Sequence, residues 1–330
     1  MCQLAITTVI TCTFNIVLRY RWVSTESEGA DPRMMIRVVQ ADRKGGIEVL
    51  SLRELPAPTI GAGDLLVRTI ASTINPVDRN IRLRDLNFPL TFGWDIAGVV
   101  VESNVLDFSP GDRVIAMTNP MPKGVGAWAD LVALDAGTVA HAPSTASLAE
   151  AATIPLAGLT ALQAWNMLTL SAGDRVLVTG AAGAIGGFAV QLAVHAGVHV
   201  DGLVSRPGHV NAARSLGAGF VTKDPKALPL NTYDAILDSI RLPAMSIVDV
   251  RELVKENGQY VVTGKDESNI PGGHAIQVTA DRDGLQQLVK MVDAGALQLR
   301  IAAHYPLSQI HDAHQHFEAG GVLGKIVIDF

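Results

Sequence analysis

The hydrophobic positions of the chain change their period near residue 147. From Met35 to that point, short apolar runs such as IRVVQ (36–40) and LLVRTIAST (65–73) are separated by turn sequences such as SPGD (109–112). Runs of this length, bounded by proline, glycine and aspartate, are typical of β-strands. The pattern predicts a β-rich region that contains no helix of length.

Beyond residue 147, helical periodicity alternates with short apolar runs. The predicted helices cover residues 147–168 (interrupted at Pro155), 187–197, 209–218 and 247–258. The predicted strands cover residues 175–180, 198–204, 233–240 and 259–264. Strands that alternate with helices of this length indicate a parallel, doubly wound sheet. From about Leu297 the pattern returns to mixed structure, and it ends on a strand at 325–330.

The first 33 residues do not fit either pattern. Residues 2–18 are apolar and rich in threonine, and arginines follow them at positions 19 and 21. A signal peptide carries its positive charge before the apolar run, and a membrane-spanning helix needs about 20 apolar residues. We therefore leave residues 1–33 outside the fold, either as a disordered extension or as the result of an over-long start assignment, with the natural start at Met34 or Met35. A short membrane anchor or a cleaved signal is the alternative.

Composition narrows the class of protein. The chain has 330 residues, a formal net charge of −6 and 48% hydrophobic residues, so it offers no basic surface for nucleic acid and enough apolar side chains for two folded domains. Its two cysteines, Cys2 and Cys12, both precede the predicted fold. A disulfide framework and a cysteine-based zinc knuckle are therefore excluded from the folded part. We expect a cytoplasmic enzyme.

A glycine-rich turn follows the predicted strand at 175–179. The turn reads GAAGAIG (180–186) and leads directly into a predicted helix. Glycines in this context let backbone N–H groups approach a pyrophosphate, whose charge is favoured by the positive end of the helix dipole. The spacing is GxxGxxG, and the short-chain reductases are set aside because no tyrosine has a lysine four residues later. We predict dinucleotide binding at Gly180, Gly183, Ala184, Ile185 and Gly186.

The end of the next strand indicates which dinucleotide is bound. An NAD site normally places an acidic residue there for the ribose 2′-hydroxyl, whereas a 2′-phosphate requires a cation and a hydroxyl. The chain supplies Ser205 and Arg206, and Asp201 lies in mid-strand, where we interpret it as structural. Ser205 and Arg206 therefore favour NADPH.

Many collinear segments resemble one family, the medium-chain dehydrogenase/reductases, and within it the zinc-independent quinone oxidoreductase-like branch. The segments are INPVD, FPLTFGWDIAGVV, SPGDRV, GAWADLVAL, AATIPLAGLTALQAW, AGDRVLVTGAAGAIG and LGKIVI. The resemblance implies an α/β protein in which a GroES-like β-barrel domain (34–155 and 297–330) is split around a Rossmann domain (156–296). It also implies NADPH-dependent reduction of a quinone or an α,β-unsaturated carbonyl compound, often by a homodimer.

The resemblance also implies which residues form the site. Asn75 would contact the nicotinamide edge, Thr160 would place its hydroxyl near the nicotinamide, and Asp78 could supply a proton. Thr263 and Gly264, at the end of a strand, would contact the cofactor. The alternatives are that Asn75 and Asp78 cap a loop and that the hydroxyl of Thr160 bonds to the preceding helical turn.

The chain departs from the family in three respects. The family's tyrosine near the ribose 2′-phosphate is absent, and Lys223 and Asp224 lie in that part of the sequence instead. The family's tyrosines after the NxxD segment are replaced by Asn80 and Leu86, which puts the substrate in doubt. Where zinc-dependent relatives carry zinc ligands, this chain has Gly93, Trp94 and Asp95, and it has no cysteine beyond Cys12. Zinc needs thiolate, imidazole or carboxylate ligands, so we predict no metal site.

Three further features have ordinary structural interpretations. Asp95 is expected to be a buried hydrogen-bonding group. His311, His314 and His316 are expected on a solvated helix face. Lys325 is expected to begin the last strand, and a contact with the cleft is the alternative.

The sequence therefore predicts a hydride-transfer enzyme that uses NADPH. The alternative, from another class, is an NADPH-binding but catalytically idle protein that acts as a redox sensor or a structural dimer. RNA binding is disfavoured by the net charge.

Overall fold

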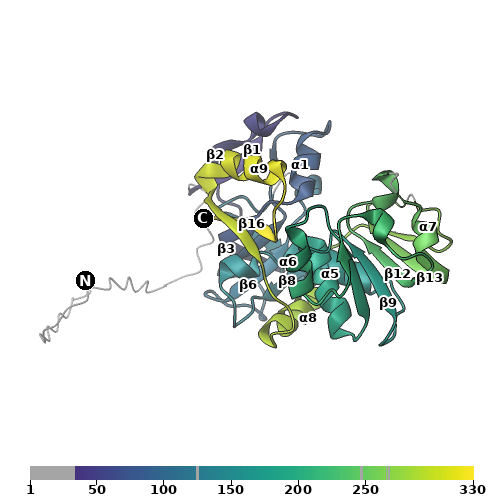
Figure 1. Ribbon diagram of the computed structural model, residues 1–330. Helices are drawn as coiled ribbons and strands as arrows, with labels where there is room; N and C mark the ends of the chain where they lie inside the picture. Colours follow the sequence, from purple (N-terminus) through teal and green to yellow (C-terminus); the bar gives the residue numbers. More distant parts are fainter. Residues whose placement is uncertain (1–33, 124–125, 246–247, 265, 267) are drawn as a thin grey trace, which may run out of the picture.

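The computed structural model describes residues 34–123, 126–245, 248–264, 266 and 268–330 (Figure 1). The predictions for residues 1–33, with Cys2 and Cys12, lie outside this part of the chain. Within it, no helix combines the length and the apolar character needed to cross a membrane.

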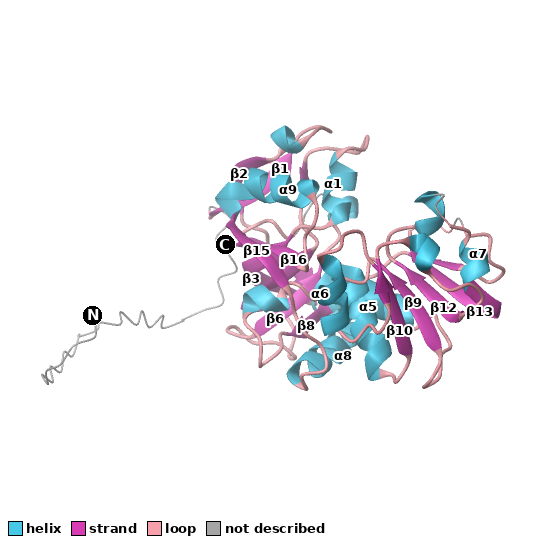
Figure 2. Cartoon of the chain, viewed as in Figure 1, coloured by secondary structure: helices cyan, strands magenta, loops and turns pink. Residues whose placement is uncertain are grey.

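The β-rich region forms two sheets in which most strand pairs are antiparallel (Figure 2). The larger has the order β15-β16-β3-β5-β6-β8, and β7 also pairs with β3. Its strands are β3 (Asp64–Thr73), β5 (Asp95–Ser103), β6 (Arg113–Met117), β7 (Leu131–Asp135), β8 (Val139–His141), β15 (Ile301–Pro306) and β16 (Lys325–Asp329). The smaller sheet contains β2 (Ser51–Pro56), β1 (Met35–Ala41) and β4 (Leu90–Thr91). Most of these strands bury an apolar core on one face.

The alternating region forms one parallel sheet of six strands in the order β11-β10-β9-β12-β13-β14. These strands are β9 (Arg175–Thr179), β10 (His199–Leu203), β11 (Val221–Thr222), β12 (Tyr233–Asp238), β13 (Val254–Thr263) and β14 (His274–Ile276). The central strand β9 is buried over Val176–Thr179, as expected for a strand covered on both faces. The predicted GroES-like and Rossmann architecture is confirmed.

Helices pack against the parallel sheet and the larger β-rich sheet. The α-helices are α1 (Pro76–Arg82), α2 (Pro120–Lys123), α3 (Leu148–Ala151), α4 (Pro155–Trp165), α5 (Ala184–His195), α6 (His209–Ser215), α7 (Val250–Leu253), α8 (Arg282–Asp293) and α9 (Ile310–Ala319). Short 3₁₀ helices lie at Ile47–Val49, Ala136–Thr138, Pro225–Ala227, Leu242–Met245 and Leu307–Gln309. Helices α4 and α5 pack together and bury most of their side chains, so one apolar cluster continues from the parallel sheet to β3 and β5.

The C-terminal segment returns to the β-rich region. Strand β16 pairs antiparallel with β3, with Val327 opposite Thr73, and β15 pairs parallel with β16 (Figure 1, yellow). The backbone N–H of Ile74 also donates to the carbonyl of Ile326 at 3.1 Å. This register brings Lys325, at the start of β16, to the end of β3, where Asn75 follows.

Two predictions of secondary structure are wrong. The predicted helix at 247–258 is only the four residues of α7, because Val254 already pairs with Tyr233 in the β12–β13 ladder and Asn257 has a φ of 67°, which no α-helix allows. The loop predicted after Asn75 is instead α1, with proline at its first position. Asp201, which the sequence analysis interprets as structural, is buried and accepts from the Arg175 guanidinium at 3.0–3.1 Å.

The expectation of a solvated histidine face on α9 is wrong for His314. This side chain is fully buried, its ring meets Trp128 edge-on with 5.3 Å between centroids, and neither ring nitrogen has a hydrogen-bond partner among the residues described. His314 lies four residues after Ile310 and three before Phe317, so it shares the face of α9 that Ile310 and Ala313 bury. Burial, with the nearby Arg82 charge, lowers the pKa of His314 to about 3.

This buried histidine should make folding stability depend on pH. Its folded pKa lies below the ordinary 6.5, so its contribution is fully present above pH 6.5 and is lost as the pH falls and the unfolded chain takes up the proton. Between pH 7.5 and pH 5.0 the expected loss is about 2 kcal/mol. Urea titrations at both pH values give the free energy of unfolding. Between them, His314→Phe should lose about 2 kcal/mol less than the wild type. Parallel losses in the two proteins would contradict the assignment.

Candidate active site

The glycine-rich turn joins β9 to α5 in a conformation that depends on two glycines. Gly180 has a φ of 62°, and a Cβ atom there would lie 2.5 Å from the Ser239 hydroxyl oxygen. A Cβ atom on Gly186 would lie 2.2 Å from the Gly180 carbonyl oxygen, so the turn closes only around glycine. The first helical bond runs from the Gly187 N–H to the Gly183 carbonyl at 2.9 Å. The N–H groups of residues 184–186 therefore lie ahead of the helical ladder and can receive an anion.

This turn forms one wall of a cleft with a volume of about 480 Å³. The cleft runs from the turn and the end of β10 to the end of β3 and the start of β16. Its polar and turn residues are Asn75, Gly180, Gly183, Ala184, Ile185, Gly186, Ser205, His209, Lys223, Ser239, Gly321, Gly324 and Lys325. Among the described residues that line the cleft there are two lysines and no carboxylate. The cleft is therefore suited to an anionic ligand.

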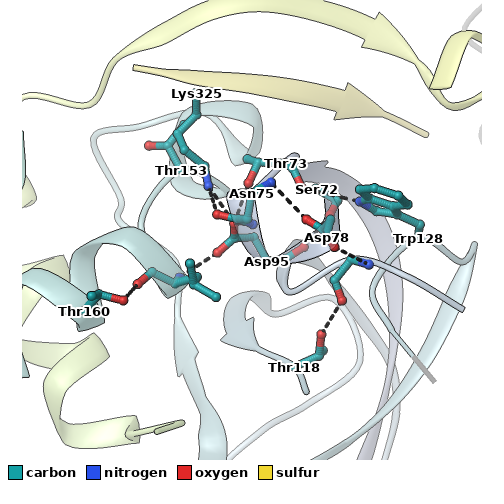
Figure 3. Close-up of polar contacts among 12 residues, drawn as sticks. Ser72, Thr73, Asn75, Asp78, Asp95, Thr118, Trp128, Thr153, Thr160 and Lys325 are labelled. Atoms are coloured by element: carbon teal, nitrogen blue, oxygen red, sulfur yellow. Dashed lines mark hydrogen bonds and ion pairs between the residues drawn. The ribbon is translucent and has the colours of Figure 1, made fainter. Parts of the chain in front are cut away.

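The far end of the cleft is organised around Asp95, the first residue of β5 (Figure 3). Its carboxylate is fully buried. One oxygen accepts from the backbone N–H of Leu156 at 2.6 Å, and the other accepts from Asn75 Nδ2 at 2.8 Å and from the Thr73 hydroxyl. The Lys325 ammonium lies 3.1 Å from that second oxygen. The expectation of a buried hydrogen-bonding role for Asp95 is confirmed.

Lys325 is the functional candidate whose importance sequence reasoning underestimated. Its side chain is 4% exposed and lines the cleft, and its ammonium donates to Asn75 Oδ1 as well as to Asp95. The two partners fix the Asn75 amide, because its oxygen accepts from Lys325 while its nitrogen donates to Asp95 (Figure 3). The available signal was a lysine directly before the apolar run at residues 326–328. Asn75 lines the cleft beside it, and its expected contact with the nicotinamide edge stays a prediction.

Asp78 lies behind this cluster and does not line the cleft. Its carboxylate accepts from the backbone N–H of Asn75 at 2.9 Å and of Gly93 at 3.2 Å, and the side chain is fully buried. Burial raises the pKa of Asp78 to about 7, although both N–H groups favour the carboxylate. One oxygen thus holds the start of α1 and the other holds Gly93 ahead of β5, and a proton-donor role for Asp78 stays a prediction.

Thr160 is likewise displaced from the cleft. Its hydroxyl donates to the Leu156 carbonyl at 2.6 Å, within α4. Leu156 and Ala157, one turn earlier, line the cleft in its place. The hydroxyl bonds to the preceding helical turn, as the alternative expected, and a contact of Thr160 with the nicotinamide stays a prediction.

Of the residues predicted at the ribose and at the end of β13, one lines the cleft and three do not. Ser205 lines the cleft, whereas the Arg206 guanidinium is turned toward residues 319–321, where a Cβ atom on Gly321 would meet it at 2.2 Å. Thr263 and Gly264 do not line the cleft, and Gly264 faces the Arg241 side chain. The expected cofactor contacts of Arg206, Thr263 and Gly264 stay predictions. Sequence reasoning did not assign His209 and Lys223, which do line it.

The side chains at the far end do not fit a zinc ion. Zinc takes thiolate, imidazole or carboxylate ligands, but here an amide and an ammonium surround a single carboxylate whose oxygens are already engaged. Across the described ranges, no three His, Cys, Asp or Glu side chains gather as a metal site would require.

Residues 61–144 match the alcohol dehydrogenase GroES-like domain, and residues 216–328 match a family described as zinc-binding dehydrogenase. A 2-methylene-furan-3-one reductase from Solanum lycopersicum is 32% identical over 304 residues, covering 86% of this chain and 76% of the relative. An NADPH-dependent alkenal/one oxidoreductase from Arabidopsis thaliana is 29% identical, covering 93% and 82%. A solved quinone oxidoreductase from Coxiella burnetii is 26% identical with a TM-score of 0.81, covering 90% of this chain and all of that one.

These matches agree with the fold, and the chain belongs to the quinone oxidoreductase-like branch of the medium-chain dehydrogenase/reductases. It is an oxidoreductase of this superfamily.

Proposed function

We propose that this protein reduces a conjugated carbonyl compound, an enone or a quinone, with NADPH and without zinc. The observation that carries the proposal is the single cleft that joins the glycine-rich turn to the Asn75–Lys325 pair and is lined by cations and no carboxylate. The names of the alkenal/one and quinone oxidoreductase relatives support the same reaction class.

Different residues of the cleft would bind different parts of the cofactor. The N–H groups of residues 184–186 would hold the pyrophosphate. Ser205, His209 and Lys223 would surround the ribose 2′-phosphate. An acidic residue for a 2′-hydroxyl is absent from the end of β10, where the chain reads Val204, Ser205, Arg206. These features favour NADPH over NADH.

The far end of the cleft would hold the nicotinamide and the acceptor. Bound NADPH supplies a hydride. Asn75, whose amide is fixed by Asp95 and Lys325, would orient the nicotinamide edge. Lys325 keeps a positive charge at the cleft surface, where it would stabilise negative charge that develops on an acceptor oxygen. Because these residues provide no zinc ligand set, the acceptor must be activated by its own conjugation, and the proton is expected from solvent.

An NADPH-oxidation assay across enones, quinones and saturated ketones tests this proposal. We expect turnover with conjugated acceptors and none with saturated ones. NADPH binding without turnover on any acceptor would instead support the catalytically idle protein. Homodimer formation and a cytoplasmic location stay predictions, which gel filtration and cell fractionation test.

The cofactor preference should depend on Lys223 more than on Arg206. Lys223→Ser removes a cation that lines the cleft, so the Kd for NADPH should rise about tenfold while that for NADH stays constant. Arg206→Ser, the matched control, should change the NADPH Kd less than threefold because that guanidinium faces residues 319–321. Fluorescence titration measures both values. The reverse order of effects would show that Arg206 reaches the 2′-phosphate.

A further inference from the structure

Arg300, immediately before β15, reaches across to the underside of the glycine-rich turn. Its guanidinium donates to the Ala182 carbonyl at 2.9 Å and to the Gly183 carbonyl at 2.6 Å. The contact is close, because a Cβ atom on Gly187 would lie 1.9 Å from Arg300 Nη2. A residue from the segment that leads into the β-rich sheet thus holds the turn of the parallel sheet.

The charge of Arg300 has no local counter-ion. Its partners are neutral carbonyls, and no carboxylate of the described residues lies within ion-pair distance of it. Burial lowers the pKa of this guanidinium, with no opposing contribution from an acidic neighbour. An arginine nevertheless stays charged at any physiological pH. The turn therefore has an unbalanced positive charge beneath it, and an anion on the cleft side would balance that charge.

The bonds to the carbonyls also orient the turn. The C=O and N–H groups of a trans peptide point in opposite directions. A bond that holds the Gly183 carbonyl toward Arg300 therefore directs the Ala184 N–H the other way, and Ala184 lines the cleft. The fork of the guanidinium holds two successive carbonyls, which a single-point donor such as lysine could not do equally well.

The backbone of Arg300 connects the turn with the far end of the cleft. Its carbonyl accepts from the Lys325 N–H at 3.0 Å, and Gly324, with a φ of 106°, packs against it. Arg300, Ala184 and Lys325 line the same small pocket. One residue therefore contacts both the turn and the segment that places Lys325.

We propose that Arg300 is a positioning residue for the diphosphate group of a dinucleotide: its guanidinium orients the glycine-rich turn and its unbalanced charge favours the anion. The inference rests on the proposed dinucleotide site and adds to it a residue outside the turn and outside the main cleft. The ligand class is a pyrophosphate, in contrast to the 2′-phosphate at the other end of the cleft.

Two substitutions test the proposal by different means. Arg300→Met removes the charge and keeps the length of the side chain. Gly187→Ala leaves Arg300 unchanged but places a methyl group where its guanidinium lies, and alanine is favoured inside α5. Arg300→Lys keeps the charge without the fork. Arg214→Met, an exposed arginine on α6, is the matched control.

The readout is the Kd of two probes, NADPH and adenosine 2′-monophosphate, which lacks the pyrophosphate. Arg300→Met and Gly187→Ala should each raise the NADPH Kd at least tenfold and change the monophosphate Kd less than twofold. The NADPH Kd of Arg300→Lys should lie between those of wild type and Arg300→Met. Arg300→Lys keeps the charge, so it still tests the proposal if Arg300→Met is unstable. Unchanged NADPH affinity, or equal weakening of both probes, would overturn the role of Arg300. Failure of the wild type to bind NADPH would overturn the proposed function itself.

Discussion

Lys325→Met should lower kcat for an enone at least a hundredfold while changing the NADPH Kd less than threefold. The substitution removes the positive charge at the cleft surface and releases the Asn75 amide, which Lys325 and Asp95 hold from opposite sides. It also leaves the Asp95 carboxylate buried without a cation, which should reduce the free energy of unfolding by about 3–5 kcal/mol. Steady-state kinetics and urea unfolding measure the two effects.

A second substitution separates the two effects of losing Lys325. Adding Asp95→Asn to Lys325→Met removes the unpaired charge, and the new amide can donate to Asn75 once the Asn75 amide turns over. Stability should return to within about 1–2 kcal/mol of wild type, while kcat stays low. Lys255→Met, which breaks an exposed lysine pair with Asp234 at 2.8 Å, is the control and should leave kcat unchanged. Recovery of kcat along with stability would show that Lys325 serves the fold alone.

Gly186→Ala should abolish cofactor binding, with an NADPH Kd raised more than a hundredfold. The new Cβ atom would lie 2.2 Å from the Gly180 carbonyl oxygen and 3.0 Å from Ala181 Cα, and both are backbone atoms that cannot rotate away. The turn must open, and its N–H groups then no longer converge on one anion. Isothermal titration of NADPH measures the loss.

Gly208→Ala is the matched control for the turn. Gly208 lies before α6, has a φ of −63°, and a Cβ atom there would meet nothing within 4 Å. Its NADPH Kd should stay within twofold of wild type. If Gly186→Ala bound NADPH as tightly as this control, the glycine-rich turn would not be the diphosphate site.

Local patterns predicted the parts of the fold that depend on local sequence. The strand–turn–helix unit around Gly180 and Gly186 was predicted because period, glycine spacing and helix length all agree within about 20 residues. The prediction of a helix at 247–258 was wrong because Val254 pairs with Tyr233 in the sheet despite the helical pattern of the sequence. The prediction for His314 was wrong because His314 lies on the same face of α9 as Ile310 and Ala313, which is the buried one.

The candidate site was predictable at one end only. The turn and Ser205 follow strands that can be identified along the sequence, whereas Lys325 and Asn75 are 250 residues apart and meet through the β16–β3 ladder. Resemblance placed Asp78 and Thr160 near the reaction, but each side chain bonds to nearby backbone and is turned from the cleft. Side-chain direction is set by these contacts, which a sequence motif does not specify.

The most direct test of the account follows the hydrogen that is transferred. The wild-type enzyme is incubated with an enone and NADPH dideuterated at C4 of the nicotinamide, and the product is examined by mass spectrometry and NMR. We expect one deuterium on the β-carbon of a saturated ketone, with no zinc added. NADPH that binds in the cleft but transfers no deuterium to any enone or quinone would contradict it.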